Sequence, residues 1–279
     1  MLDPRLPDVR RHVVGLCVRL VRDYGLDGLK LDFLDQAGVY GDGVGAAVHT
    51  LMSELMAELE AIRPGVLIEL RQPYVGPGMA PFGNMLRAAD CPADAVANRV
   101  GTIDVGLLAV GGAVHADMLM WDPAGSTRSA ARQLIGALHA VPQISARLAD
   151  LPEEQRRMVA FWLEQWRSLR PLLLDGEVEP GRPDELYPVV RAARGSACVI
   201  TVTADRVVAL DTARFKQITV VNGTASERLV VDVAGEGLVV RRVFDAGGSR
   251  IELPAQRLRA GLGVVHVPPS GLAVLEESQ

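Results

Sequence analysis

Apolar positions recur with two different periods along the chain, and the period changes near residues 176–188. Before that stretch, apolar side chains three and four residues apart alternate with short continuous apolar runs, which predicts amphipathic helices alternating with strands. The predicted helices cover residues 8–24, 44–62, 94–108, 126–138 and 152–169, and the predicted strands cover residues 29–34, 66–70, 85–89, 113–119 and 141–146. Helices and strands that alternate with short turns are typical of a parallel sheet.

The remaining residues, 186–279, follow a different pattern. Short β-branched runs are separated by Gly, Asn and Asp at intervals of about eight to twelve residues. This pattern predicts a small antiparallel β-sandwich. We therefore expect two domains, residues 1–180 and residues 186–279.

The first domain holds about five strand–helix units, whereas a closed (β/α)₈ barrel of the TIM type has eight. The chain also opens with a helix rather than a strand. Two α/β arrangements remain open on the pattern alone. Either the units form part of such a barrel, or they form an open sheet.

Composition excludes several classes of function. Hydrophobic residues make up 49% of the 279 residues, which is enough for a core, and the net charge of −5 argues against a nucleic-acid partner. No uncharged apolar run of about 18 residues appears, so no membrane span is expected. Three widely spaced cysteines and a start without signal-peptide features favour a reducing, cytoplasmic location. The sequence leaves a homo-oligomer open.

Two charged residues interrupt the predicted strand that begins at Leu29. Lys30 and Asp32 are two residues apart and would share one face of a strand. On a barrel strand that face points to the interior, where charges are costly unless they serve a site. Catalytic residues lie at the C-terminal ends of barrel strands. The alternative is an ion pair at the edge of an ordinary sheet.

A second carboxylate follows the predicted strand at residues 85–89. Asp90 lies where that strand would meet its loop, just before a Cys-Pro turn. Asp94, at the start of the next helix, is better explained as a helix N-cap. The alternative for Asp90 is a loop carboxylate paired with Arg87.

In chain order, these segments resemble the α-galactosidases, or melibiases, of glycoside hydrolase family 36. The fourth-strand segment of that family, which carries Lys-x-Asp, is similar to DGLKLDF at residues 27–33, and its sixth-strand segment is similar to RAADCPAD at residues 87–94. The seventh-strand segment resembles HADMLMW at residues 115–121, and the last unit with its closing helix resembles residues 134–178. The resemblance covers about residues 3–180 and implies the last five units of a barrel. The β-rich tail fits the family's C-terminal domain.

The resemblance implies a retaining glycosidase with two carboxyl groups about 5 Å apart. Asp32 is expected to be the nucleophile and Asp90 the general acid/base, while Lys30 keeps Asp32 ionised. The other candidates for sugar binding are Glu69, Arg71, Arg87, His115, Asp117 and Trp121, with Tyr74 as a further stacking residue. The expected substrate is a terminal α-galactoside or a related oligosaccharide. No metal or cofactor is expected, because the five histidines lack ligand spacing.

The sequence departs from the family at two places. Residues 69–74 read Glu-Leu-Arg-Gln-Pro-Tyr where the family usually has a Cys-Ser-Gly-Gly-Gly-like sugar-binding stretch. Ala89–Asp94 replaces the familiar Ser-Asp-Asn-Thr-Asp around the acid/base. The resemblance therefore predicts the type of reaction better than it predicts the identity of the sugar.

Two other functions remain open. One is a barrel lyase or racemase, with Lys30 as a base and with Asp32, Glu69 and Asp90 holding Mg²⁺. The other is a non-catalytic remnant of a glycosidase. A barrel without its first units would expose an edge strand, and we would expect such a chain to be unstable alone.

Overall fold

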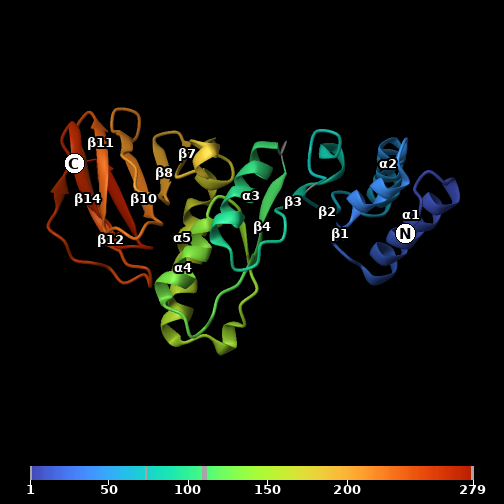
Figure 1. The fold of residues 1–279 in the computed structure, drawn as a ribbon, viewed down its shortest axis with the longest axis horizontal. Coiled ribbons are helices and arrows are strands. Elements are labelled where there is room, and N and C mark those ends of the chain that lie inside the picture. Colours follow the sequence, from blue (N-terminus) through green and yellow to red (C-terminus); the bar gives the residue numbers. More distant parts are fainter. Residues whose placement is uncertain (1, 73, 109–111, 278–279) are drawn as a thin grey trace. The chain divides into compact units, whose positions relative to one another are not determined.

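The computed structural model describes residues 2–72, 74–108 and 112–277, and Figure 1 shows their arrangement. Helices alternate with strands in the first part of the chain. The helices are α1 (Pro7–Tyr24), α2 (Val44–Ile62), α3 (Ala95–Leu108), α4 (Thr127–Gly136) and α5 (Glu153–Leu173). The strands are β1 (Gly28–Leu31), β2 (Leu67–Arg71), β3 (Met85–Arg87), β4 (Ala113–Leu119) and β5 (Val141–Ile144).

These five strands form one sheet in the order β1-β2-β3-β4-β5, so each strand lies next to its neighbour in sequence. β1 to β4 pair in parallel. This confirms the predicted parallel sheet of about five strand–helix units.

Local sequence explains where the helices begin and end. α1 has Pro7 at its first position and Asp8 in its first turn, and it ends at Gly25 in the left-handed region, with φ 64°. The apolar face of α2, which the periodicity predicted, packs against the core. Leu55 and Leu59 on this face are almost fully buried. Asp94 accepts hydrogen bonds from the amides of Val96 and Ala97, which confirms it as the N-cap of α3.

The second part of the chain is β-rich, as predicted. One sheet has the order β13-β12-β15-β10-β8-β7-β6 and the other the order β14-β11-β9. The strands are β6 (Glu177–Glu179), β7 (Val189–Arg194), β8 (Ala197–Val202), β9 (Val208–Asp211), β10 (Gln217–Asn222), β11 (Arg228–Ala234), β12 (Leu238–Phe244), β13 (Gln256–Arg257), β14 (Gly261–His266) and β15 (Leu272–Glu277).

The tail differs from a wholly antiparallel arrangement at two pairings. β8 pairs with β10 in parallel, and β9 pairs with β11 in parallel. Buried side chains of the two sheets belong to one hydrophobic core, with Ile200 and Val220 from the larger sheet and Val231 from the smaller. The shared core supports the predicted sandwich, which stays a prediction.

The chain packs as two compact units, Met1–Asp90 with Asp104–His115, and Cys91–Ile103 with Ala116–Gln279. The chain passes between the units after Asp90, within α3 and within β4. The predicted domains at residues 1–180 and 186–279 stay a prediction. None of the described helices is both long enough and apolar enough to cross a membrane.

Gly28 opens β1, and its lack of a side chain lets β1 approach β2 closely. A Cβ at this position would lie 2.3 Å from the carbonyl oxygen of Leu67, its register partner. We expect Gly28→Ala to lower the free energy of unfolding by roughly 1–3 kcal/mol, because the backbone of one strand must shift. Urea denaturation measures the change, and hydrogen exchange of the β1 and β2 amides localises it.

Gly45→Ala is the matched control. Gly45 lies in the first turn of α2, and no described atom lies within 4 Å of a Cβ built there. This variant should be neutral or more stable by up to about 1 kcal/mol, since alanine favours a helix. Equal stabilities of the two variants would contradict the close approach at Gly28.

Candidate active site

The candidate site forms where β1, β2 and β3 end. Asp32 follows the last residue of β1, Arg71 ends β2 and Arg87 ends β3. Parallel strands carry their C-terminal ends to the same edge of a sheet, so these residues meet. The register places Lys30 beside Glu69 and Arg71 beside Arg87.

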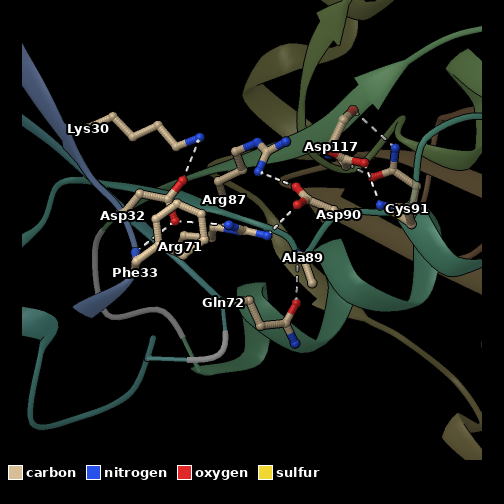
Figure 2. A network of polar contacts seen from close by, with 11 residues as sticks. Lys30, Asp32, Phe33, Arg71, Gln72, Arg87, Ala89, Asp90, Cys91 and Asp117 are labelled. Carbon is tan, nitrogen blue, oxygen red and sulfur yellow. Dashed lines mark hydrogen bonds and ion pairs between the residues drawn. The ribbon is translucent and has the colours of Figure 1, made fainter. Parts of the chain in front are cut away.

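Arg71 joins the two predicted catalytic carboxylates. Its Nη1 donates to Oδ1 of Asp32 over 2.9 Å, and its Nη2 donates to Oδ2 of Asp90. Arg87 donates from Nη1 to the other oxygen of Asp90 over 3.0 Å. Figure 2 shows the Arg71 side chain lying between the two carboxylates. Each carboxylate therefore contacts a guanidinium, and one guanidinium contacts both.

Asp32 has two further supports. The Nζ of Lys30 lies 3.3 Å from its Oδ2, and the amide of Phe33 donates to its Oδ1 over 2.9 Å. β1 ends at Leu31, so Asp32 lies one residue beyond the strand that was predicted to contain it. Phe33 has φ 58°, and this left-handed turn places its ring 5.6 Å from the Arg71 guanidinium.

These contacts fix the charge of Asp32. Desolvation pushes the pKa of Asp32 upward. The hydrogen bonds from Arg71, the Phe33 amide and Lys30 together outweigh it, and they hold the pKa below its usual value. Asp32 is therefore ionised at neutral pH, as a nucleophile must be.

Exposure differs between the members of the site. The Arg87 side chain is only 5% exposed and that of Arg71 16%, whereas the Asp90 side chain is 53% exposed. The cations therefore lie deeper than the carboxylate they contact. Among the described residues, Nε of Arg71 is buried without a hydrogen-bond partner.

Glu69 and His115 form a second pair beside the first. The Nδ1 of His115 lies 2.9 Å from Oε2 of Glu69. This hydrogen bond lowers the pKa of Glu69, against the effect of burial, and the charges of Lys30 and Arg87 act in the same direction. The structure thus brings seven predicted site residues together: Lys30, Asp32, Glu69, Arg71, Arg87, Asp90 and His115.

Asp117 and Trp121 belong to the other compact unit. Asp117 is fully buried, and its Oδ2 accepts from the amide of Cys91 over 2.5 Å, which anchors the turn that follows Asp90. Trp121 donates from Nε1 to Oε1 of Gln155 over 3.0 Å. Their predicted contacts with sugar stay predictions.

Tyr74 and Gln72 support the site in ways that the sequence did not reveal. The hydroxyl of Tyr74 donates to the carbonyl of Leu31, the last residue of β1. Burial, with a smaller effect from Asp32, raises the pKa of Tyr74 to about 12. Oε1 of Gln72 accepts from the amide of Ala89 over 3.1 Å, beside Asp90. Both residues lie in the stretch, residues 69–74, that departs from the family pattern. That departure was the one sequence signal that could have pointed to their roles.

The Mg²⁺ alternative does not fit this geometry. A cation, the Arg71 guanidinium, already lies between Asp32 and Asp90. Glu69 is engaged by His115. In the parts of the chain that the structure describes, no three His, Cys, Asp or Glu side chains gather in a way that suits a metal ion.

Comparison with known proteins identifies the fold. No protein-family profile and no curated protein matches the chain. Among solved structures, the family 36 α-galactosidase AgaA of Geobacillus stearothermophilus is similar with a TM-score of 0.59 and 13% identity, over 99% of this chain and 39% of AgaA. The galactosidase domain of the α-galactosidase-sucrose kinase AgaSK gives 0.60 and 14%, over 99% and 38%. Amy13B of Eubacterium rectale gives 0.58 and 10%, over 99% and 65%.

The chain therefore has a glycoside hydrolase fold. More particularly, it has the fold of the C-terminal region of the family 36 α-galactosidases, which confirms the resemblance at the level of fold. It spans about 39% of the length of AgaA. Variants of AgaA have been solved with 1-deoxygalactonojirimycin, raffinose and stachyose. One fold can serve different substrates, so the fold does not by itself determine the substrate.

The charge of Asp32 can be tested by its titration. We expect a carboxyl NMR titration to place the pKa of Asp32 below the usual value of about 3.9. A carboxyl whose pKa is lower in the folded than in the unfolded protein stabilises the fold, and this stabilisation is complete above the unfolded pKa. The stabilisation is lost as the pH falls through the folded pKa. Arg71→Gln should move the midpoint upward, because it removes the strongest of the opposing hydrogen bonds.

Asp23→Asn, at an exposed pair with Arg22 on α1, is the control and should leave the Asp32 titration unchanged. An Asp32 midpoint at or above about 3.9 in the unaltered chain would contradict the inferred contacts.

Proposed function

We propose that this fold hydrolyses terminal α-galactosides by double displacement, with Asp32 as nucleophile and Asp90 as general acid/base. The observation that carries the proposal is the contact of both carboxylates with one guanidinium at the strand ends. Retaining glycosidases separate their carboxyl groups by about 5–5.5 Å, and inverting enzymes by about 6.5–9.5 Å. Both carboxylates lie within reach of one guanidinium, and we infer retention from the family resemblance.

The two carboxylates differ in exposure and in their contacts, which supports different roles for them. Asp32 is held ionised by three donors and is the less exposed of the two. It would attack the anomeric carbon and form the glycosyl-enzyme. Asp90 is half exposed, so water can reach it. It would protonate the leaving oxygen and then take a proton from the incoming water.

The comparisons support a class of substrate. Variants of AgaA were solved with raffinose and stachyose, and this chain shares the fold of part of AgaA. We therefore propose an α-galactoside or a related α-glycoside, with Lys30, Glu69 and His115 as hydroxyl contacts. The cytoplasmic location and a homo-oligomer stay predictions from the sequence.

Azide rescue tests both roles at once. We expect the chain to release p-nitrophenol from p-nitrophenyl α-D-galactopyranoside, and Asp32→Ala to reduce kcat by at least about 10³-fold while the fold is retained. With azide, Asp32→Ala should yield the β-galactosyl azide, because azide enters from the face that the nucleophile vacates. Asp90→Ala should yield the α-galactosyl azide, because azide replaces water in the second displacement. The azides are distinguished by proton NMR.

Asp35→Ala is the matched control. Asp35 is an exposed carboxylate in the 3₁₀ helix that follows β1, and its removal should leave turnover unchanged. Unreduced turnover by Asp32→Ala would overturn the nucleophile assignment, and exchanged anomers would exchange the two roles. Absence of hydrolysis by the unaltered chain would overturn the proposed activity for this chain.

A further inference from the structure

Phe33 brings a large apolar side chain into the candidate site. It follows Asp32 directly, and it is 58% exposed although phenylalanine is among the residues most often buried. Its ring lies 5.6 Å from the guanidinium of Arg71, the cation that contacts both Asp32 and Asp90 (Figure 2). An exposed aromatic ring therefore lies beside the polar contacts that hold both proposed catalytic carboxylates.

The backbone of Phe33 is strained. Its φ of 58° lies in the left-handed region, which a bulky residue seldom adopts because it costs free energy. Among the described residues of its compact unit, Phe33 is the one residue other than glycine with a positive φ. Such outliers cluster at functional sites, where the surrounding structure maintains them.

The hydrogen bond from the Phe33 amide explains the turn but not the ring. In this conformation the amide donates to Oδ1 of Asp32 over 2.9 Å. Glycine would supply the same amide and would adopt this φ without strain. The ring therefore needs a reason of its own. Its contact with Arg71 is only part of that reason, because most of the residue stays exposed.

The neighbours of the ring limit what can cover it. A wholly apolar partner would also take the charges of Asp32 and Arg71 out of water, which is costly. Ligand sites instead combine aromatic walls with a few polar groups that fix the orientation of the ligand. A pyranose suits both features, because its C–H groups form an apolar face and its hydroxyls lie around the edge.

We propose that the ring of Phe33 is a stacking platform for the apolar face of the sugar whose anomeric carbon Asp32 attacks. The inference rests on the proposed glycosidase function, and it adds a substrate-binding residue that the sequence pattern did not identify. The left-handed turn directs the Phe33 amide to Asp32 and the ring toward Arg71. One residue thus orients the nucleophile and holds the sugar beside it.

An NMR experiment locates the ring directly. The ligand is p-nitrophenyl 1-thio-α-D-galactopyranoside, whose sulfur linkage resists hydrolysis, and the protein carries ¹³C-labelled phenylalanine. We expect nuclear Overhauser effects between the Phe33 ring protons and the C–H protons of the sugar, and upfield shifts of these sugar protons from the ring current. Phe33→Leu keeps an apolar side chain without a ring, so it identifies the Phe33 signals and should abolish both effects.

Kinetics of p-nitrophenyl α-D-galactopyranoside measure what the ring contributes. Phe33→Ala should lower kcat/KM by roughly tenfold, mainly through KM, because it removes apolar contact that substrate and transition state share. Phe33→Trp should retain most of kcat/KM. Leu186→Ala is the matched control and should leave kcat/KM unchanged, because Leu186 has a similar φ of 59° and is 50% exposed but belongs to the other compact unit.

Phe33→Gly separates the ring from the backbone. Both Phe33→Gly and Phe33→Ala remove the ring, but only glycine relieves the strain at positive φ. We therefore expect Phe33→Gly to unfold at a higher urea concentration than Phe33→Ala and to show the same loss of kcat/KM. Recovery of turnover in Phe33→Gly would mean that the turn, and not the ring, serves the reaction.

The outcomes distinguish the inference from the proposed function. Hydrolysis that Phe33→Ala leaves unchanged overturns the role of the ring while the proposed function stands, and so do contacts of the ring with the nitrophenyl group in place of the sugar. Contacts with the sugar in a chain that does not hydrolyse the galactoside overturn the proposed function and leave the stacking role standing. Failure to bind the thiogalactoside overturns both.

Discussion

The guanidinium of Arg71 is the contact on which the candidate site depends. It ends β2 and joins Asp32, which follows β1, to Asp90, which follows β3. Charge-assisted hydrogen bonds are roughly twice as strong as neutral ones, and partial burial reduces their screening by salt. Without this cation, the two carboxylates would repel one another across neighbouring strand ends. This one side chain therefore holds the ends of three neighbouring strands in a fixed relation.

The position of Asp32 depends on packing that lies behind it. β1 has only four residues, and its parallel register with β2 is what carries Asp32 to the edge of the sheet. Gly28 permits the close approach at the start of β1, and the Tyr74 hydroxyl holds the carbonyl at its end. Because burial raises the pKa of Tyr74 to about 12, this donor keeps its proton across the physiological range. The position of Asp32 is thus set by groups outside the proposed catalytic pair.

Helix positions and caps could be predicted, because hydrophobic periodicity and residue type determine them. Contacts that depend on how the strands pair could not be predicted. α1 and α2 were placed within a residue or two, and Asp94 was recognised as a cap, because both signals are local. α5 continues through Pro171 to Leu173, beyond the predicted end, since a proline in a last turn removes only one hydrogen bond.

The parallel pairing of β8 with β10 was missed, because a buried β-branched run shows that a strand is covered but not the direction of its partner. The acidic residues were found by their positions at strand ends. The Arg71 bridge was not, since it depends on side chains from three strands.

Likeness of fold at 10–14% identity does not determine the chemistry of this chain. Parallel strands deliver their last side chains to one edge, whatever those side chains are. In this chain two adjacent strands both end in arginine, and Arg71 and Arg87 are register partners. Two such cations repel unless an anion contacts both, and Asp90 does so from the loop beyond β3. A change in the charge of Asp90 would therefore act on both arginines.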